Sequence, residues 1–247
     1  MPAFIDNMAV QSYCFRNFKD NKQVADLVKK IGLSRIEVCG VHVNFNEPST
    51  FDTAIKTYAD AGVKIVSIGV EGFGADEAAA RKRFDFAKAA GCKIISANFK
   101  PDTFLAALPI AYKLCDEYGI KLAIHNHGGY HWLGSSEILS WVFSFTRCCI
   151  GLNMDTAWAL DARQNPVEWA DKFAKRLYAV HLKDFVFDRA RKSTDVIVGE
   201  GNVDLPALIK KMEANGFAGE AIVEYEGDVN DPVPALTKCV KAIKAAG

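Results

Sequence analysis

Short apolar runs alternate with longer stretches of helical spacing along the whole chain. Eight runs are rich in β-branched and apolar residues, and their starts lie about thirty residues apart until a longer last interval. The runs are Ala9–Phe15, Arg35–Cys39, Lys64–Gly69, Lys93–Phe99, Lys121–His127, Ile150–Asp155, Tyr178–Asp184 and Glu220–Tyr225. This spacing fits a strand, a helix and two short loops. The pattern therefore predicts a repeated strand–helix unit.

Helical stretches fill the gaps, and the four clearest each end at a glycine, which helix C-termini favour because it adopts positive φ. They are Asp20–Ile31, Thr50–Ala61, Asp76–Ala90 and Pro109–Tyr118. Alternating strands and helices predict a parallel sheet covered by helices, and eight repeats favour a closed barrel over an open doubly wound sheet. The 247 residues also match the usual size of such a barrel. We predict an α/β fold, a single (β/α)8 TIM barrel over residues 1–247.

Composition narrows the classes of partner. Lys plus Arg and Asp plus Glu both total 30, so no net charge attracts nucleic acid or an anionic membrane. No Gly-x-Gly-x-x-Gly or Gly-Lys-Ser/Thr motif indicates nucleotide binding. The seven scattered cysteines without a Cys-x-x-Cys pair favour reduced thiols, and no signal peptide or apolar membrane span is evident. We expect a cytoplasmic protein that acts on a small molecule. A homo-oligomer is compatible with the sequence.

Four successive predicted strands end in residue types that bind metals or transfer protons, where barrel enzymes place their catalytic groups. These ends are His125-Asn126-His127, Asn153-Met154-Asp155, His181-Leu182-Lys183-Asp184 and Glu224-Tyr225-Glu226. Because side chains alternate along a strand, His125 and His127 share one face. Apolar Leu182 belongs against the helices, which turns His181 and Lys183 inward. Imidazole with carboxylates favours one divalent ion such as Mn²⁺, Zn²⁺, Co²⁺ or Fe²⁺ over Mg²⁺.

These motifs, in this order, resemble the xylose isomerase-like barrel superfamily, often called sugar phosphate isomerases/epimerases and related to AP endonuclease family 2. The resemblance covers essentially the whole chain. In the epimerase members a Glu, an Asp, a His and a Glu on strands five to eight hold the metal. The last three carry over to Asp155, His181 and Glu224. His125 occupies the position of the first Glu and can still act as a ligand. The matching pieces are Arg35-Ile36-Glu37, Ile124-His125-Asn126-His127, Gly151-Leu152-Asn153-Met154-Asp155-Thr156, Val180-His181-Leu182-Lys183-Asp184, Gly199-Glu200-Gly201 and Val223-Glu224-Tyr225.

The resemblance implies a metal-dependent isomerase or epimerase that removes the α-proton of a keto sugar or related polyol and passes through an enediolate. Glu224 is the candidate base, with His127 or Lys183 as the second proton-transfer group. His125 argues against epimerisation by a pair of Glu residues. The alternative is a keto-sugar or keto-inositol lyase or dehydratase, acting by β-elimination on substrates such as 3-keto-glycosides. A non-catalytic sugar-binding barrel and an endonuclease IV-like nuclease are weaker readings, and the neutral chain fits the nuclease poorly.

Further residues near the strand ends are candidates for substrate contacts. Trp158 directly follows the Asp155 strand and can stack on a sugar ring. At the ends of the first strands, Glu37 and Glu71 either reach the mouth or serve as solvated or capping groups. Glu200 lies in the Gly199–Gly201 turn, whose backbone N–H groups are candidates for a substrate contact. No basic cluster accompanies that turn, so a phosphate group is not implied.

Overall fold

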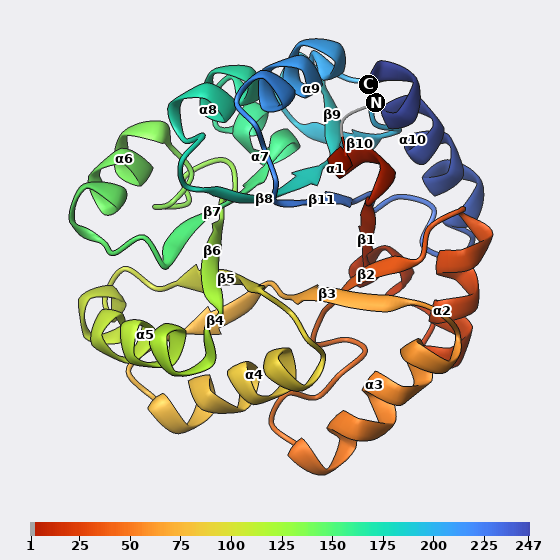
Figure 1. The fold of residues 1–247 in the computed structure, drawn as a ribbon. Helices are drawn as coiled ribbons and strands as arrows, with labels where there is room; N and C mark the ends of the chain where they lie inside the picture. The colour runs from red at the N-terminus through yellow and green to blue at the C-terminus, as the bar shows by residue number, and fades with distance from the viewer. Residues whose placement is uncertain (1–2) are drawn as a thin grey trace.

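The structure is a computed structural model that describes residues 3–247, so the first two residues of the predicted domain 1–247 lie outside the described part. A ring of strands occupies the centre and helices surround it (Figure 1). The sheet order is β3-β2-β1-β11-β8-β7-β6-β5-β4, and every pairing in it is parallel. Its strands are β1 Ala9–Gln11, β2 Arg35–Val38, β3 Lys64–Ile68, β4 Glu71–Phe73, β5 Ile94–Phe99, β6 Lys121–His125, β7 Ile150–Asp155, β8 Leu177–Leu182 and β11 Glu220–Val223.

The two ends of this sheet order, β3 and β4, follow one another directly in the chain. β3 pairs with β2, and β4 pairs with β5. They are therefore two segments of one barrel strand, and eight strand positions complete the ring. Each of the eight predicted apolar runs overlaps one of these positions. The predicted (β/α)8 barrel is confirmed, whereas the assignment of all 247 residues to one domain stays a prediction.

Helices cover the outside of the ring (Figure 1). Their bounds are α1 Ala3–Asp6, α2 Asn21–Lys30, α3 Phe51–Asp60, α4 Glu77–Ala89, α5 Phe104–Tyr118, α6 Ser136–Phe145, α7 Thr156–Asp161, α8 Pro166–Lys172, α9 Leu205–Ala214 and α10 Val233–Ala246. Helices such as α2, α4 and α5 have buried apolar residues. Gly119 ends α5 in the left-handed conformation, with φ 66°. In the part of the chain described here, no helix is long and apolar enough to cross a membrane.

Two element boundaries differ from the prediction by four or more residues. α5 begins at Phe104 rather than Pro109, because Phe104 and Leu108 are buried on one helix face and their packing outweighs the N–H that proline lacks. The strand predicted to reach Phe15 stops at Gln11. There the Gln11 side chain accepts a hydrogen bond from the backbone N–H of Tyr13, which turns the chain into a short 3-10 helix.

The long last interval contains an extra antiparallel hairpin, β9 Asp184–Phe187 with β10 Ser193–Val196. The Asp184 carboxylate accepts four backbone N–H groups, those of Gly199, Gly201, Asn202 and Val203, at 2.9–3.0 Å. These bonds bring the chain after β10 back against the end of β8. The interval is an ordered elaboration beside the barrel mouth rather than a linker.

Candidate metal centre at the barrel mouth

Four side chains from four adjacent strands converge where the strands end. His125 is the last residue of β6, Asp155 the last of β7, His181 lies near the end of β8, and Glu224 directly follows β11. All four side chains are buried. One ligand atom from each lies within 4.8 Å of the other three. The structure thus brings the four residues predicted as ligands to one point.

The donor atoms at this point face one another directly. Nδ1 of His181 lies 2.8 Å from Oε2 of Glu224 and 3.1 Å from Nε2 of His125. The same His125 nitrogen lies 3.5 Å from Oδ2 of Asp155. That Asp155 oxygen is buried and has no hydrogen-bond partner among the described residues. Because an unpartnered buried polar atom is costly, this convergence of two nitrogens and two oxygens fits a borderline divalent ion.

Burial and neighbouring charges set the protonation states of these groups. Burial, together with His181, lowers the pKa of His125 to about 3, so its imidazole is neutral near pH 7. Burial opposes the charged form of His181 too, but Glu37 and Glu224 outweigh it and raise the pKa to about 10. Despite burial, Lys183 and His181 hold the pKa of Glu224 below its usual range. The cluster therefore offers an ionised carboxylate and a neutral imidazole, both of which can ligate a cation.

Lys183 lies beside the four ligand candidates and is 1% exposed. Its ammonium forms an ion pair with Glu226 and lies 3.7 Å from Asp195 Oδ2 and 3.9 Å from Glu224 Oε1. It also lies over the ring of Trp158, at 5.5 Å from the centroid. His181 and Lys183 both reach the cluster, as the alternation along β8 predicts. Glu224 and the other carboxylates raise the pKa of Lys183 against the effect of burial, so the side chain stays protonated.

A pocket of about 470 Å³ opens onto this cluster. It is lined by Gln11, Tyr13, Cys39, Gly40, Val41, Gly69, Val70, Glu71, His125, His127, Trp158, Glu224 and Glu226. Of the predicted substrate contacts, Glu71 and Trp158 are on its wall. His127 is there as well, and burial followed by the effect of His125 lowers its pKa to about 3. A neutral imidazole at this position can accept a proton or a hydrogen bond from a bound hydroxyl.

The two other predicted substrate contacts are elsewhere. Glu37 is fully buried, and its carboxylate contacts His181 instead of lining the pocket. Glu200 is exposed in the turn after β10 and is not on the pocket wall. The backbone N–H groups of Gly199 and Gly201 donate to Asp184, so they do not reach a substrate. Sequence spacing places these residues near the mouth, but it does not reveal which hydrogen bonds they have already formed.

Asp195 is a member of the site that the sequence analysis missed. It lies on β10, and its Oδ2 accepts a hydrogen bond from the backbone N–H of Glu226 and approaches Lys183. Burial raises its pKa to about 7, although Lys183 opposes this effect. The run Ser193–Val196 is a polar stretch of an inserted hairpin, and no sequence signal relates it to the strand ends.

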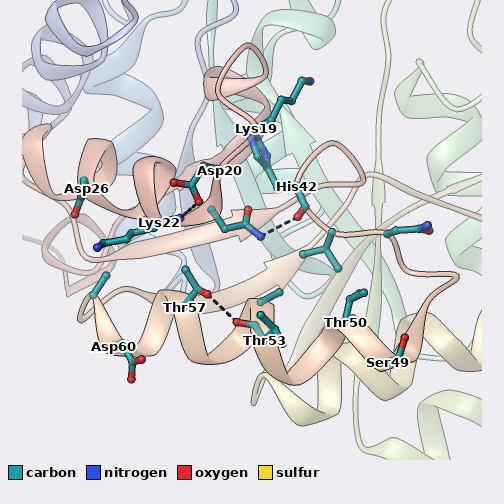
Figure 2. Close-up of a pocket in the computed structure, with 15 residues that line it drawn as sticks. Lys19, Asp20, Lys22, Asp26, His42, Ser49, Thr50, Thr53, Thr57 and Asp60 are labelled. Atoms are coloured by element: carbon teal, nitrogen blue, oxygen red, sulfur yellow. Dashed lines mark hydrogen bonds between the residues drawn. The ribbon is translucent and has the colours of Figure 1, made fainter.

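A larger cavity of about 990 Å³ lies on the outside of the barrel, away from this cluster. Figure 2 shows it between the start of α2, the loop that contains His42, and α3. Thr50, Thr53 and Thr57 line one side of it. It holds none of the four candidate ligands, so size alone does not identify the chemical site.

Comparison with known proteins agrees with this arrangement. The family model for the xylose isomerase-like TIM barrel matches residues 25–245. The rhizopine catabolism protein MocC of Rhizobium meliloti is 30% identical over 132 residues, covering 48% of this chain and 40% of that protein. An inosose dehydratase of Clostridium beijerinckii is 26% identical over 148 residues, covering 53% of this chain and 50% of the enzyme. The chain thus spans about half or less of the length of these curated relatives.

A solved structure extends the likeness over the whole barrel. The xylose isomerase-like TIM barrel protein of Mycobacterium smegmatis, in complex with magnesium, superimposes with a TM-score of 0.77 and 17% sequence identity. The match covers 97% of this chain and 96% of that protein. At this identity the comparison shows a shared fold.

Proposed function

Because the chain belongs to the xylose isomerase-like TIM barrel family, we propose that it is a divalent-metal-dependent enzyme that removes a proton next to the carbonyl of a polyhydroxy ketone. The observation that carries this proposal is the convergence of His125, Asp155, His181 and Glu224 at one buried point that borders a pocket. These four residues would hold the ion. When bound, the ion polarises a substrate carbonyl and its neighbouring hydroxyl, so that the adjacent proton becomes more acidic.

Glu224 is the group we assign as base. Its carboxylate borders the pocket and is ionised, because Lys183 and His181 hold its pKa low despite burial. One oxygen contacts His181 and the other lies 3.9 Å from Lys183. The carboxylate is therefore fixed in position, as a base needs to be for proton transfer.

The substrate we propose is an uncharged keto sugar or keto-cyclitol. Among the described residues, the pocket wall contains no lysine or arginine, so nothing there would pair with a phosphate or carboxylate. Trp158 offers a flat apolar face to the C–H bonds of a sugar ring. Glu71 and Glu226 offer acceptors for hydroxyl groups, while the neutral imidazole of His127 can bind another.

The first reaction we propose is isomerisation or epimerisation, because the chain belongs to the xylose isomerase-like family. After Glu224 takes the proton, its return to the neighbouring carbon gives an isomer. Delivery of a proton to the opposite face by a second group gives an epimer. We assign His127 to such a second transfer, because it borders the pocket and its ring nitrogens can exchange a proton with the substrate.

A lyase is the second candidate, and one observation favours it. His125, not a glutamate, ends β6, so the cluster has no second Glu opposite Glu224 to exchange a proton. β-Elimination needs only one base and an acid at the leaving hydroxyl or alkoxyl. We assign Lys183 as this acid, because its ammonium lies just behind the pocket wall, 3.9 Å from Oε1 of Glu224, which borders the pocket. An inosose dehydratase is also among the curated relatives.

The test is incubation of the metal-loaded protein with inososes, 3-keto-glycosides and ketohexoses in D₂O, followed by NMR. Mn²⁺, Zn²⁺, Co²⁺ and Fe²⁺ should be compared with Mg²⁺, which is present in the M. smegmatis structure. Deuterated isomers or epimers support the first candidate, and an enone or a released alcohol supports the second. If no ketone exchanges its α-proton with any of these ions, the catalytic proposal fails. A protein that binds such sugars without exchange would instead be a binding module.

A further inference from the structure

We propose that Glu37 is a positioning residue of the metal centre, which acts through His181 and is itself held by Gln11. This inference rests on the metal site proposed above and adds two residues that are not ligands. Glu37 comes from β2 and Gln11 from β1. Glu37 contacts Nε2 of His181, the nitrogen that does not face the other ligand candidates. Neither residue is among the four whose ligand atoms converge.

The two nitrogens of His181 have different partners. Nε2 lies 2.8 Å from Oε1 of Glu37, while Nδ1 faces Glu224 and His125. A carboxylate can only accept, so it fixes a proton on Nε2. Nδ1 also faces a carboxylate, that of Glu224, so without a cation it carries a proton as well. A cation bound at Nδ1 would take the place of that second proton, while Glu37 keeps the proton on Nε2. Glu37 thus selects the tautomer and ring orientation in which His181 can bind a cation.

Gln11 fixes Glu37 in turn. Its Nε2 donates to the same Glu37 oxygen at 2.5 Å and to the backbone carbonyl of Gly69 at 3.1 Å. Gln11 and Glu37 are direct partners in the parallel pairing of β1 with β2, so both side chains point to the same side of the sheet. Hydrogen bonds thus connect the carbonyl of Gly69, Gln11, Glu37 and the imidazole of His181, and the three side chains are buried.

Burial separates this role from substrate binding. Glu37 has 0% of its surface exposed and is absent from the pocket wall. Glu71, on the next strand position, provides the contrast. It borders the pocket, and its carboxylate forms an ion pair with Arg83 at 2.7 Å rather than contacting His181. Glu71→Gln is therefore the matched control for removal of a buried carboxylate near the mouth.

The experiment measures Mn²⁺ affinity from the EPR signal of the free ion. Glu37→Ala should bind Mn²⁺ about 10- to 100-fold more weakly than the unaltered chain, the usual effect of losing such a partner. Glu37→Gln keeps an acceptor for His181 but loses the charge, so its affinity should lie between the two. Glu71→Gln should stay within about twofold of the unaltered chain. Circular dichroism of each variant without metal checks that it is folded.

A second readout follows the imidazole itself. In ¹⁵N spectra of the Zn²⁺-loaded protein, His181 should carry its proton on Nε2, and Glu37→Gln should keep that tautomer while Glu37→Ala exchanges the proton faster. Equal Mn²⁺ affinity of folded Glu37→Ala and the unaltered chain, or a His181 bound through Nε2, would overturn the inference alone. Absence of Mn²⁺ and Zn²⁺ binding by the unaltered chain would overturn the proposed metal centre and this inference with it.

Discussion

Oε2 of Glu224 lies 2.8 Å from Nδ1 of His181, although 43 positions separate the two residues in the chain. Adjacent parallel strands, β11 and β8, place them side by side at the mouth of the barrel. This contact joins the proposed base to a proposed ligand. Changes at either residue should therefore affect both metal binding and proton transfer.

Glu224→Gln tests the base. The amide cannot take a proton, so we expect exchange of the substrate α-proton to fall by about 10²- to 10⁴-fold at saturating metal. The measurement is the rate of deuterium incorporation by NMR. Glu200→Gln is the matched control, because Glu200 is exposed and off the pocket wall, and its rate should not change. Exchange that survives in Glu224→Gln would assign the base to another residue.

Variants of His125 test whether this residue is a metal ligand at the position where the epimerases have a glutamate. We expect His125→Ala to weaken Mn²⁺ binding by at least about tenfold. His125→Glu should restore binding, because a carboxylate is also a ligand. Without metal, however, the new charge lies beside Asp155 and Glu224, so the melting temperature should fall and then recover when Mn²⁺ is added. Calorimetry with and without Mn²⁺ measures both effects. An unchanged affinity in His125→Ala would remove this residue from the ligand set.

The buried His42 lies away from the metal cluster, and we expect it to make the free energy of unfolding depend on pH. It is buried, and its Nε2 donates to the carbonyl of Phe18 at 2.9 Å. Burial lowers its pKa in the folded state below the ordinary value of about 6.5. As pH falls through that value, the unfolded chain binds the extra proton, so the contribution of His42 is present above pH ~6.5 and is lost below it.

The matched variant is His42→Gln, compared with the unaltered chain by urea unfolding between pH 8 and pH 5. Its deficit in unfolding free energy should be largest at pH 8 and should shrink toward pH 5. A deficit that is the same at every pH would mean that His42 does not titrate differently in the folded and unfolded states.

Asp184 tests the docking of the β9–β10 hairpin. Its carboxylate accepts four backbone N–H groups, and an asparagine has only one oxygen to offer. We expect Asp184→Asn to lower the unfolding free energy by about 2–4 kcal/mol. Hydrogen exchange at residues 199–203 should rise as well. Asp188→Asn, near the exposed tip of the hairpin, is the control and should change little. Unaltered exchange in Asp184→Asn would show that other contacts hold the hairpin.

The fold could be predicted because its signals are local. Apolar runs and the helical stretches between them give the strand–helix repeat. Repetition of that unit predicts a parallel sheet, and eight repeats favour a closed barrel. The alternation of side chains at the end of β8 was enough to predict that His181 and Lys183 point into the barrel. The local pattern misplaced the start of α5. Proline is unfavourable inside a helix, so the pattern predicted a start at Pro109, whereas the packing of Phe104 places the start five residues earlier.

The sequence by itself determined the barrel and the four strand ends that carry His125, Asp155, His181 and Glu224. The reason is that the carboxyl ends of parallel strands lie at the same end of a barrel, independently of the loops that connect them. Only the tertiary structure decided which polar groups were already paired. Glu37 contacts His181 rather than the pocket, the backbone of the Gly199–Gly201 turn binds Asp184, and Asp195 approaches Lys183 from an inserted hairpin. Each of these contacts joins separate strands or loops, and hydrogen bonding depends on distances of a few tenths of an ångström that no spacing along the chain specifies.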